Sequence, residues 1–288
     1  MTTGIVKASL FPGVMGATIA LAVVLQRAGW PAELWFFAAV ATNLVAVAVL
    51  ERLFPRVEGV DLLRDPQAPR DLIHALLTAL VGSPLGSLAA TLVLVATVGR
   101  RGVFDLWPTS WPLVVQVLLA WLIWGFFDYW KHRAYHRVDC FWWLHALHHD
   151  VDAMHVLKGG RLHLLEGTVR MALVAVPLIV LGAPMEVFLW MATVDSAMGN
   201  LSHSNLDQRF PRFAHWLVPT VDLHHIHHAA DRSLHDTNLG VPIFDLLFGT
   251  YTSPAQVPRP AIGGSAGEVP PKLAGQLLFP LQRWLARA

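Results

Sequence analysis

Four long apolar segments in the first half of the chain limit what it can fold into. They lie at about residues 11–25, 34–50, 72–98 and 111–130. A helix needs roughly 20 predominantly apolar residues to cross the hydrocarbon core of a bilayer, and each segment is close to that length. Charged residues make up only 14% of the chain, whereas soluble domains contain about a quarter. We therefore predict an all-α membrane protein with four spans.

A fifth apolar region, residues 169–199, is interrupted by Gly182-Ala183-Pro184. Its halves of about a dozen residues would each reach about 18 Å as helix, short of the roughly 30 Å hydrocarbon core. A hairpin that enters the membrane and returns fits better, because a single crossing would put the histidines before and after it on opposite sides. Gly82-Ser83-Pro84-Leu85-Gly86 leaves a hairpin open within the third span as well.

Histidines cluster around this interrupted region. The spacing is H-x-x-x-H for His132 and His136, and H-x-x-H-H both for His145, His148 and His149 and for His224, His227 and His228. Residues three and four apart share one face of a helix, so each cluster should present its imidazoles to one point in space. His163 and His203 are single candidates nearby, and the one cysteine, Cys140, excludes a cysteine-based metal site.

Ten candidate histidines exceed the four ligands of a structural zinc ion, so a pair of metals is the simplest interpretation. Imidazole suits iron, zinc, copper and nickel, and ligand type alone does not select among them. His225 lies about 100° from His224 around a helix and is left out, although a His225/His228 pair remains an alternative. His74, His215 and His235 are isolated, and we expect structural roles for them.

Three acidic residues could support the metal ligands. Asp128, Asp222 and Asp236 could accept the second ring N–H of a ligating histidine, and Asp128 precedes His132 by one helical turn. Helix capping or solvent exposure is an equal alternative for Asp222. We expect Asn238 to cap or brace the last segment of the histidine-rich region.

Seven motifs occur in order across residues 110–252. They are DYWKHRAYH at 128–136, WLHALHH at 143–149, RLHLLE at 161–166, SHSN at 202–205, HHIHH at 224–228, DTNLG at 236–240 and DLLFGT at 245–250. Together they resemble the fatty acid hydroxylase / sterol desaturase superfamily of integral-membrane di-iron enzymes. His155 stands where many relatives have Asn, and could alter the pocket or add a ligand; Leu164 stands where many have Pro.

The resemblance implies a multi-span membrane helix bundle under a cytosolic histidine-rich helical cap. It also implies two Fe ions held by the histidines, and O2-dependent hydroxylation or desaturation of a lipid that is sterol-like, fatty acyl, sphingoid or alkyl. We divide the chain into N-terminal membrane spans (1–109), a fatty acid hydroxylase-like di-iron catalytic domain (110–252) and a Pro/Gly-rich tail with a short C-terminal apolar helix (253–288).

Partners and orientation follow from what the chain carries. It has no recognisable flavin, haem or iron–sulfur module, so we expect a separate electron donor such as a ferredoxin or cytochrome b5 with its reductase. A formal net charge of +1 with scattered basic residues argues against nucleic acid. Four crossings place the histidines on the side of Lys7 and the Arg-containing loop at 52–70, which the positive-inside rule assigns to the cytoplasm.

Two alternatives belong to other functional classes. A histidine-rich membrane metal transporter would carry ionisable residues near the bilayer midplane, but the cores of the first and second spans lack His, Asp and Glu. A catalytically silent lipid-binding relative would keep the fold and lose the reaction, and the intact clusters argue against it.

Overall fold

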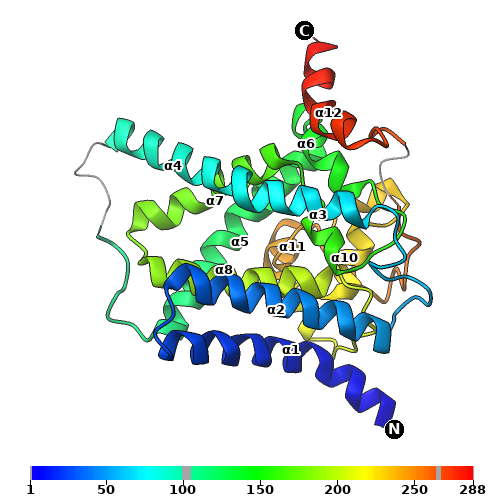
Figure 1. Ribbon diagram of the computed structural model, residues 1–288, viewed down its shortest axis with the longest axis horizontal. Helices are drawn as coiled ribbons and strands as arrows, with labels where there is room; N and C mark the ends of the chain where they lie inside the picture. The colour runs from blue at the N-terminus through cyan, green and yellow to red at the C-terminus, as the bar shows by residue number, and fades with distance from the viewer. Residues whose placement is uncertain (1, 99–104, 264–266, 288) are drawn as a thin grey trace.

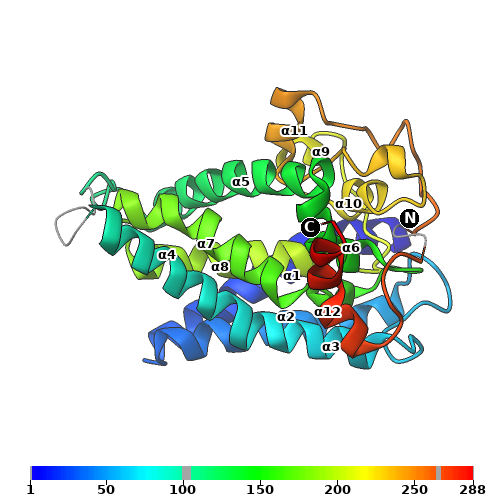
Figure 2. The same cartoon turned by 90° about the horizontal axis from the view of Figure 1, so that it is seen from above.

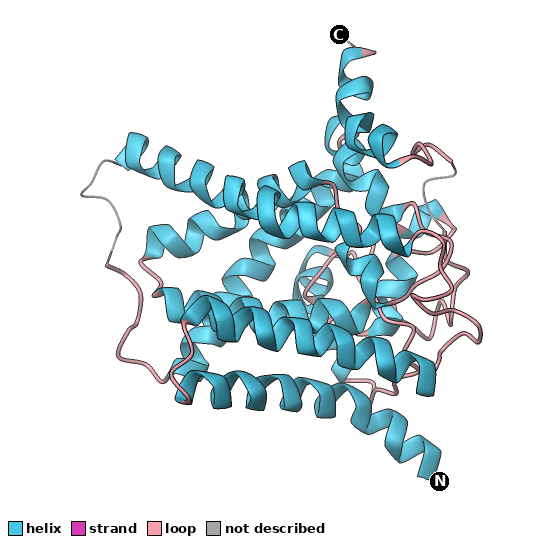
Figure 3. Ribbon diagram, viewed as in Figure 1, coloured by secondary structure: helices cyan, strands magenta, loops and turns pink. Residues whose placement is uncertain are grey.

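The computed structural model describes residues 2–98, 105–263 and 267–287, and this part of the chain consists of helices joined by loops (Figure 3). The long helices are α1 (Thr2–Arg27), α2 (Ala32–Leu53), α3 (Ala68–Leu77) together with α4 (Ser83–Val98), which continues it, α5 (Leu113–Arg137), α7 (Leu164–Leu181) and α8 (Met185–Ser202). They run side by side (Figure 1). The short helices are α6 (Asp139–His149), α9 (Ala214–Leu217), α10 (Val221–His227), α11 (Pro242–Phe248) and α12 (Leu273–Leu285).

Five helical segments are long and apolar enough to cross a membrane. They are Gly4–Arg27, Ala32–Leu53, Ala68–Leu92, Leu113–Arg137 and Leu164–Leu181. The first four correspond to the predicted spans, which confirms the all-α, multi-span membrane fold.

The predicted length of the two halves of the region 169–199, about a dozen residues each, was wrong. Helices α7 and α8 have 18 residues each. They are longer than the apolar runs because Glu166, Arg170 and Asp195 lie inside them, with hydrogen bonds and ion pairs to other helices. The predicted reversal itself is present: α7 leads away from α6, and α8 returns toward α10 (Figure 1). Gly182 ends α7 in the left-handed conformation, with φ of 81°, which suits glycine.

No hairpin forms in the third span. Helices α3 and α4 are continuous through a π-helical turn, η1 (Thr78–Gly82). A Cβ atom on Gly82 would lie 2.3 Å from the carbonyl oxygen of Leu164, and one on Gly86 would lie 2.3 Å from that of Thr168. The two glycines therefore permit close packing of α4 on α7, as small residues do between membrane helices.

Interhelical hydrogen bonds join the other long helices. The side-chain amide of Asn43 on α2 donates to Thr18 on α1 at 2.8 Å, and Asn200 on α8 donates to the Asn43 side-chain oxygen at 2.9 Å. Bonds between polar side chains contribute to helix association in the absence of water.

A cap forms at one end of the bundle, where α6, α9, α10 and α11 and the longer loops gather (Figure 2). Glu51, at the end of α2, accepts the backbone N–H groups of Val156 at 2.8 Å and Asn205 at 2.6 Å. Lys7 near the N-terminus pairs with Asp207. These contacts place the N-terminus, the end of α2 and the cap at the same end of the bundle.

The C-terminal segment contains the expected apolar helix. Helix α12 packs on α6, where Phe279 joins a buried cluster with Trp143 and Leu147. The indole of Trp284 donates to the carbonyl oxygen of Cys140 at 3.1 Å. Helix α12 therefore supports α6, which carries three of the candidate histidines.

Candidate metal centre

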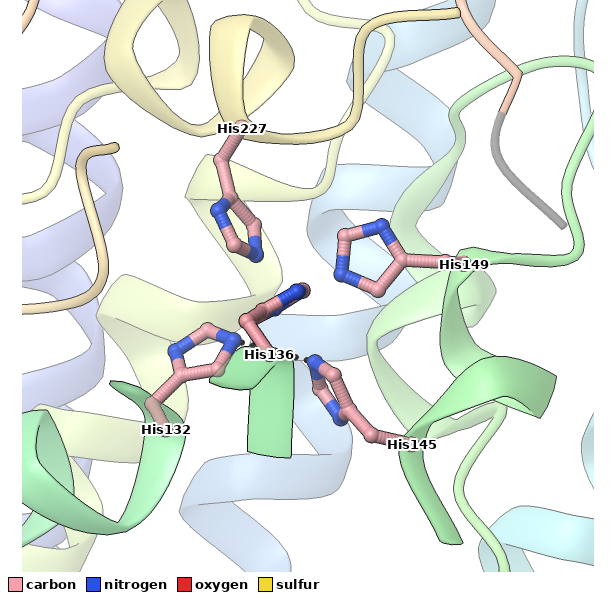
Figure 4. A group of neighbouring side chains, drawn as sticks. All are labelled: His132, His136, His145, His149 and His227. Carbon is pink, nitrogen blue, oxygen red and sulfur yellow. Dashed lines mark hydrogen bonds between the residues drawn. The ribbon is translucent and has the colours of Figure 1, made fainter. Parts of the chain in front are cut away.

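Nine of the ten candidate histidines assemble into two groups. The five-histidine group contains His132, His136, His145, His149 and His227, and the four-histidine group contains His148, His203, His224 and His228. In each group one ring nitrogen from every member lies within 4.8 Å of those from all the others. Figure 4 shows the five rings of the first group around a shared space.

The two H-x-x-H-H clusters divide between the groups, which corrects the expectation that each points to one place, whereas His132 and His136 stay together. His145 and His149 belong to one group, while His148 between them belongs to the other. His224 and His228 lie together, and His227 joins the first group. In both clusters the residues at i and i+4 therefore belong to the same group, and the residue at i+3 belongs to the adjoining group. The rings of His149 and His228 stack with centroids 4.3 Å apart, so the groups adjoin.

Backbone carbonyls fix the tautomers of three of these histidines. The Nδ1 atoms of His132, His203 and His227 donate to the carbonyl oxygens of Leu239, Gly199 and Thr237, respectively. A carbonyl oxygen can only accept, so each Nδ1 carries the proton and each Nε2 presents a lone pair. The same arrangement orients metal-binding histidines in proteins.

Several buried ring nitrogens have no hydrogen-bond partner among the described residues. These include Nε2 of His136, His149 and His227. In the four-histidine group, Nε2 of His203 lies 2.7 Å from Nε2 of His224 and 3.2 Å from Nε2 of His148. Unpaired buried nitrogens and converging lone pairs are the donor set that a metal cation satisfies.

Burial keeps these imidazoles neutral. Desolvation lowers the pKa of His227 to about 3 and that of His203 to about 4, and it lowers the pKa of His148 and His149 well below the usual value. Neutral imidazole is the form that binds metal, so these histidines are in the metal-binding form at neutral pH.

One supporting residue was missed in the sequence. The Nδ1–H of His145 donates to the Glu166 carboxylate at 2.8 Å, and both side chains are buried. The signal available was the position of Glu166 within RLHLLE, three residues after His163, but no spacing relates it to His145. Only the approach of α7 to α6 brings the pair together.

The acidic residues expected beside the ligands bond elsewhere. Asp128 pairs with Lys131 at 2.7 Å and with Arg170 at 3.2 Å. Asp222 pairs with Arg56 at 2.7 Å, and Asp236 pairs with Arg137 at 2.9 Å.

Asn238 joins two loops instead of contacting a histidine. Its Nδ2 donates to the Thr252 carbonyl and its Oδ1 accepts the Thr252 N–H, each at 3.0 Å. Its φ of 53° is left-handed, a conformation that Asn tolerates better than most residues. The following residue, Leu239, provides the carbonyl that holds His132.

His163 lies outside both groups. Its Nε2 donates to the Leu277 carbonyl at 3.1 Å, and its Nδ1 accepts the Leu165 N–H at 3.2 Å as the N-cap of α7. Both ring nitrogens are therefore occupied by protein groups.

The other histidines take varied positions. His225 donates to the Ser204 carbonyl, His74 pairs with Gln276 and His215 with Thr220. We expected His235 to be isolated, but its ring packs against that of His149 with centroids 4.6 Å apart.

His155 lies in a separate charged network. Its Nε2 is 2.8 Å from Asp65, and with Asp71 these residues form a third group of possible ligands. Lys158 already pairs with both aspartates, and Arg161 pairs with Asp71. Two protein cations therefore neutralise this site, which leaves no need for a metal.

A cavity of about 340 Å³ opens beside both histidine groups. His132 and His145 of the five-histidine group line it, as do His148, His203 and His224 of the four-histidine group. The cavity extends between α5, α7 and α8 to apolar side chains that include Leu44, Trp121 and Trp124. A substrate in this cavity would contact the centre and the interior of the helix bundle.

Comparison with known proteins identifies the class. Residues 117–250 match the model of the family described as fatty acid hydroxylase. This chain belongs to the fatty acid hydroxylase superfamily, as its motifs indicated, and is an oxidoreductase of the lipid hydroxylase class. It is 34% identical over 260 residues to the ornithine lipid hydroxylase OlsE of Rhizobium tropici, a match that covers 87% of this chain and 76% of that protein. No solved structure matches the chain.

Proposed function

We propose that this protein is a membrane-bound di-iron oxygenase that hydroxylates a lipid with O2 and electrons from a separate donor. The observation that carries the proposal is the convergence of nine histidines, each buried or half-buried, into two adjoining groups beside one cavity. The proposed ligands are the members of the five-histidine and four-histidine groups. We leave His163 out because protein groups occupy both of its ring nitrogens.

The protein residues orient and shield the centre. The carbonyls of Leu239, Gly199 and Thr237 and the Glu166 carboxylate hold four rings with their lone pairs directed inward. Two bound irons would supply the activation of O2 for oxidation of an unreactive C–H bond. Overall, one oxygen atom enters the substrate and the other becomes water, with two electrons and two protons consumed.

The electrons would come from a ferredoxin or from cytochrome b5 with its reductase. This part of the proposal rests on the chemistry, because hydroxylation consumes electrons and the sequence has no second redox module. Conversion that continues in purified membranes without any added reductant system would contradict it.

The proposed substrate is an ornithine-containing lipid. Its support is the identity to OlsE over most of both chains. Sterol-like, fatty acyl, sphingoid and alkyl lipids are the alternative substrates, and desaturation is the alternative reaction. Mass spectrometry of lipids distinguishes these alternatives.

We place the histidine groups on the cytoplasmic side. Lys7 pairs with Asp207, and Arg56 in the loop after α2 pairs with Asp222 on α10, so both basic segments lie at the cap end of the bundle. Arg52, Arg64 and Arg70 belong to the same segment as Arg56, and such basic loops are retained in the cytoplasm. Labelling of single cysteines introduced on the cap would test this orientation, and modification from the outside of intact cells would contradict it.

Mass spectrometry of total lipids tests the reaction. Aerated cells that make ornithine lipid and express this chain would be compared with cells that express His148→Ala, with His215→Ala as a matched control. We expect one lipid class to gain a single oxygen atom with the wild type and with His215→Ala, and not with His148→Ala. Loss of two hydrogens would indicate a desaturase. Unchanged lipids at equal protein abundance would contradict the proposed function.

A further inference from the structure

Four charged side chains form a recess inside the cavity, which we call the charged recess. It consists of Asp128 and Lys131 on α5, Arg170 on α7 and Asp195 on α8, and all four line the cavity. Charged residues inside a membrane bundle are costly, and they mark substrate or ion pathways unless they only pair with one another.

The pairing within the recess is incomplete. Arg170 joins the two aspartates: its Nε donates to Asp128 at 3.2 Å and its Nη2 donates to Asp195 at 2.9 Å. Lys131 donates to Asp128 at 2.7 Å, so Asp128 has two cationic partners. Asp195 has one, through its Oδ2 atom. No described residue bonds to Oδ1 of Asp195 or to Nη1 of Arg170.

Both free atoms belong to side chains that are open to the cavity. The side chain of Arg170 is 33% exposed and that of Asp195 is 24% exposed, although both residues lie well inside their helices. The recess therefore offers one carboxylate oxygen and one guanidinium N–H group to a ligand.

The recess lies close to the histidines. Asp128 precedes His132 by four residues on α5, and Asp195 precedes His203, which follows α8, by eight. At 1.5 Å per residue these separations correspond to about 6 Å and about 12 Å along the helix axes. Beyond the recess, Trp121 and Leu44 make the cavity wall apolar. A polar group held in the recess would thus lie within one or two helical turns of the centre, with space for a hydrocarbon chain beyond it.

We infer that the charged recess binds the zwitterionic headgroup of an amino-acid lipid, with an ammonium group on Asp195 and a carboxylate on Arg170. An amino acid with two amino groups retains one ammonium and one carboxylate after a single N-acylation, which matches the two free atoms. Arg170 also suits a carboxylate because its guanidinium presents N–H donors in a planar fork. This inference rests on the proposed function and deepens it, since it assigns lipid selection to particular residues.

Anaerobic binding measurements test the inference without turnover. The intact iron-containing protein in detergent micelles would be titrated by calorimetry with a short-chain N-acylornithine. The same lipid with its side-chain amine acetylated removes the positive charge, and the lipid with its carboxylate converted to the amide removes the negative charge. We expect each neutralised lipid to bind the wild type about tenfold or more weakly, because each loses a hydrogen bond between charged groups.

Asp195→Asn, Asp195→Glu and Glu186→Gln provide the matched variants. Asp195→Asn keeps the size of the side chain, and we expect it to lose the preference for the free amine. Asp195→Glu should restore part of the preference. Glu186→Gln makes the same carboxylate-to-amide change on an exposed residue of α8 and should bind as the wild type does.

Wild-type protein that binds all three lipids equally would overturn the inference, as would Asp195→Asn that keeps the preference. Failure of the proposed function is a separate result. If lipids gain oxygen in cells but binding ignores the headgroup charges, the function stands and the recess fails. If binding depends on the charges and no lipid gains oxygen, the recess stands and the hydroxylase fails.

Discussion

The Nε2 atoms of His132 and His145 lie 3.0 Å apart, although each ring donates its Nδ1 proton in the opposite direction. His132 donates to the Leu239 carbonyl and His145 to the Glu166 carboxylate. Two lone pairs therefore face each other in a buried space, and their repulsion is relieved when a cation lies between them. This relationship favours a cation between the two rings.

Removing the Glu166 carboxylate should weaken metal binding. In Glu166→Ala the His145 ring loses its acceptor and is free to turn, and loss of such an outer partner typically lowers metal affinity about 10–100-fold. Glu166→Gln keeps an acceptor oxygen and should fall between Ala and the wild type. Iron per chain after dialysis against a weak chelator measures the effect. Full iron retention by Glu166→Ala would show that the carboxylate has no part in holding the centre.

His148 and His149 are neighbours in sequence but belong to different groups. We expect His148→Ala and His149→Ala each to lower the iron content from about two to about one per chain, because each removes a ligand from one group only. The double variant should lose both ions. Elemental analysis of protein purified under identical conditions gives the counts. Retention of both ions by either single variant would contradict the division into two groups.

His163→Ala should leave the metals in place and destabilise the start of α7. Loss of a side-chain N-cap typically costs about 1 kcal/mol, and His163 accepts the Leu165 N–H in that role. Thermal unfolding in detergent measures the change, and His163→Asn, which can cap a helix, should recover part of it. A loss of iron with unchanged thermal stability would instead make His163 a ligand.

Gly86→Ala should weaken the packing of α4 on α7. The added Cβ would lie 2.3 Å from the Thr168 carbonyl oxygen, and overpacking of this kind typically costs about 1–3 kcal/mol. Gly16→Ala on α1 is the matched control, because no atom lies within 4 Å of its Cβ position. The midpoint of thermal unfolding should fall for Gly86→Ala and stay level or rise for Gly16→Ala. Equal unfolding midpoints for the two variants would contradict close packing of α4 on α7 at Gly86.

The features that could be predicted from the sequence are those that a single helix determines. The apolar spans depend on composition along a single segment, and four of the five candidate spans are those that the pattern predicts. The histidine spacing likewise singled out residues that the structure brings together. The reversal between α7 and α8 was predictable because Gly182 and Pro184 interrupt an apolar region.

What was missed depends on contacts between segments distant in sequence. Glu166 meets His145 only because α7 passes beside α6, and His235 reaches His149 from a loop after α10. The lengths of α7 and α8 were underestimated because their charged residues have partners on other helices, such as Asp128 with Arg170. Asp222 and Asp236 were expected beside the ligands on proximity in sequence alone, and arginines from other segments bind them instead.

The exchange of single histidines between the two groups also affects how the protein can assemble. Neither half of the centre is encoded by a continuous stretch, since α6 and α10 each contribute to both. A chain that ends before α10 would lack His227 of the five-histidine group and both His224 and His228 of the four-histidine group. The two histidine groups are therefore complete only after α10 has packed, so the proposed metals would bind late, to a nearly finished fold.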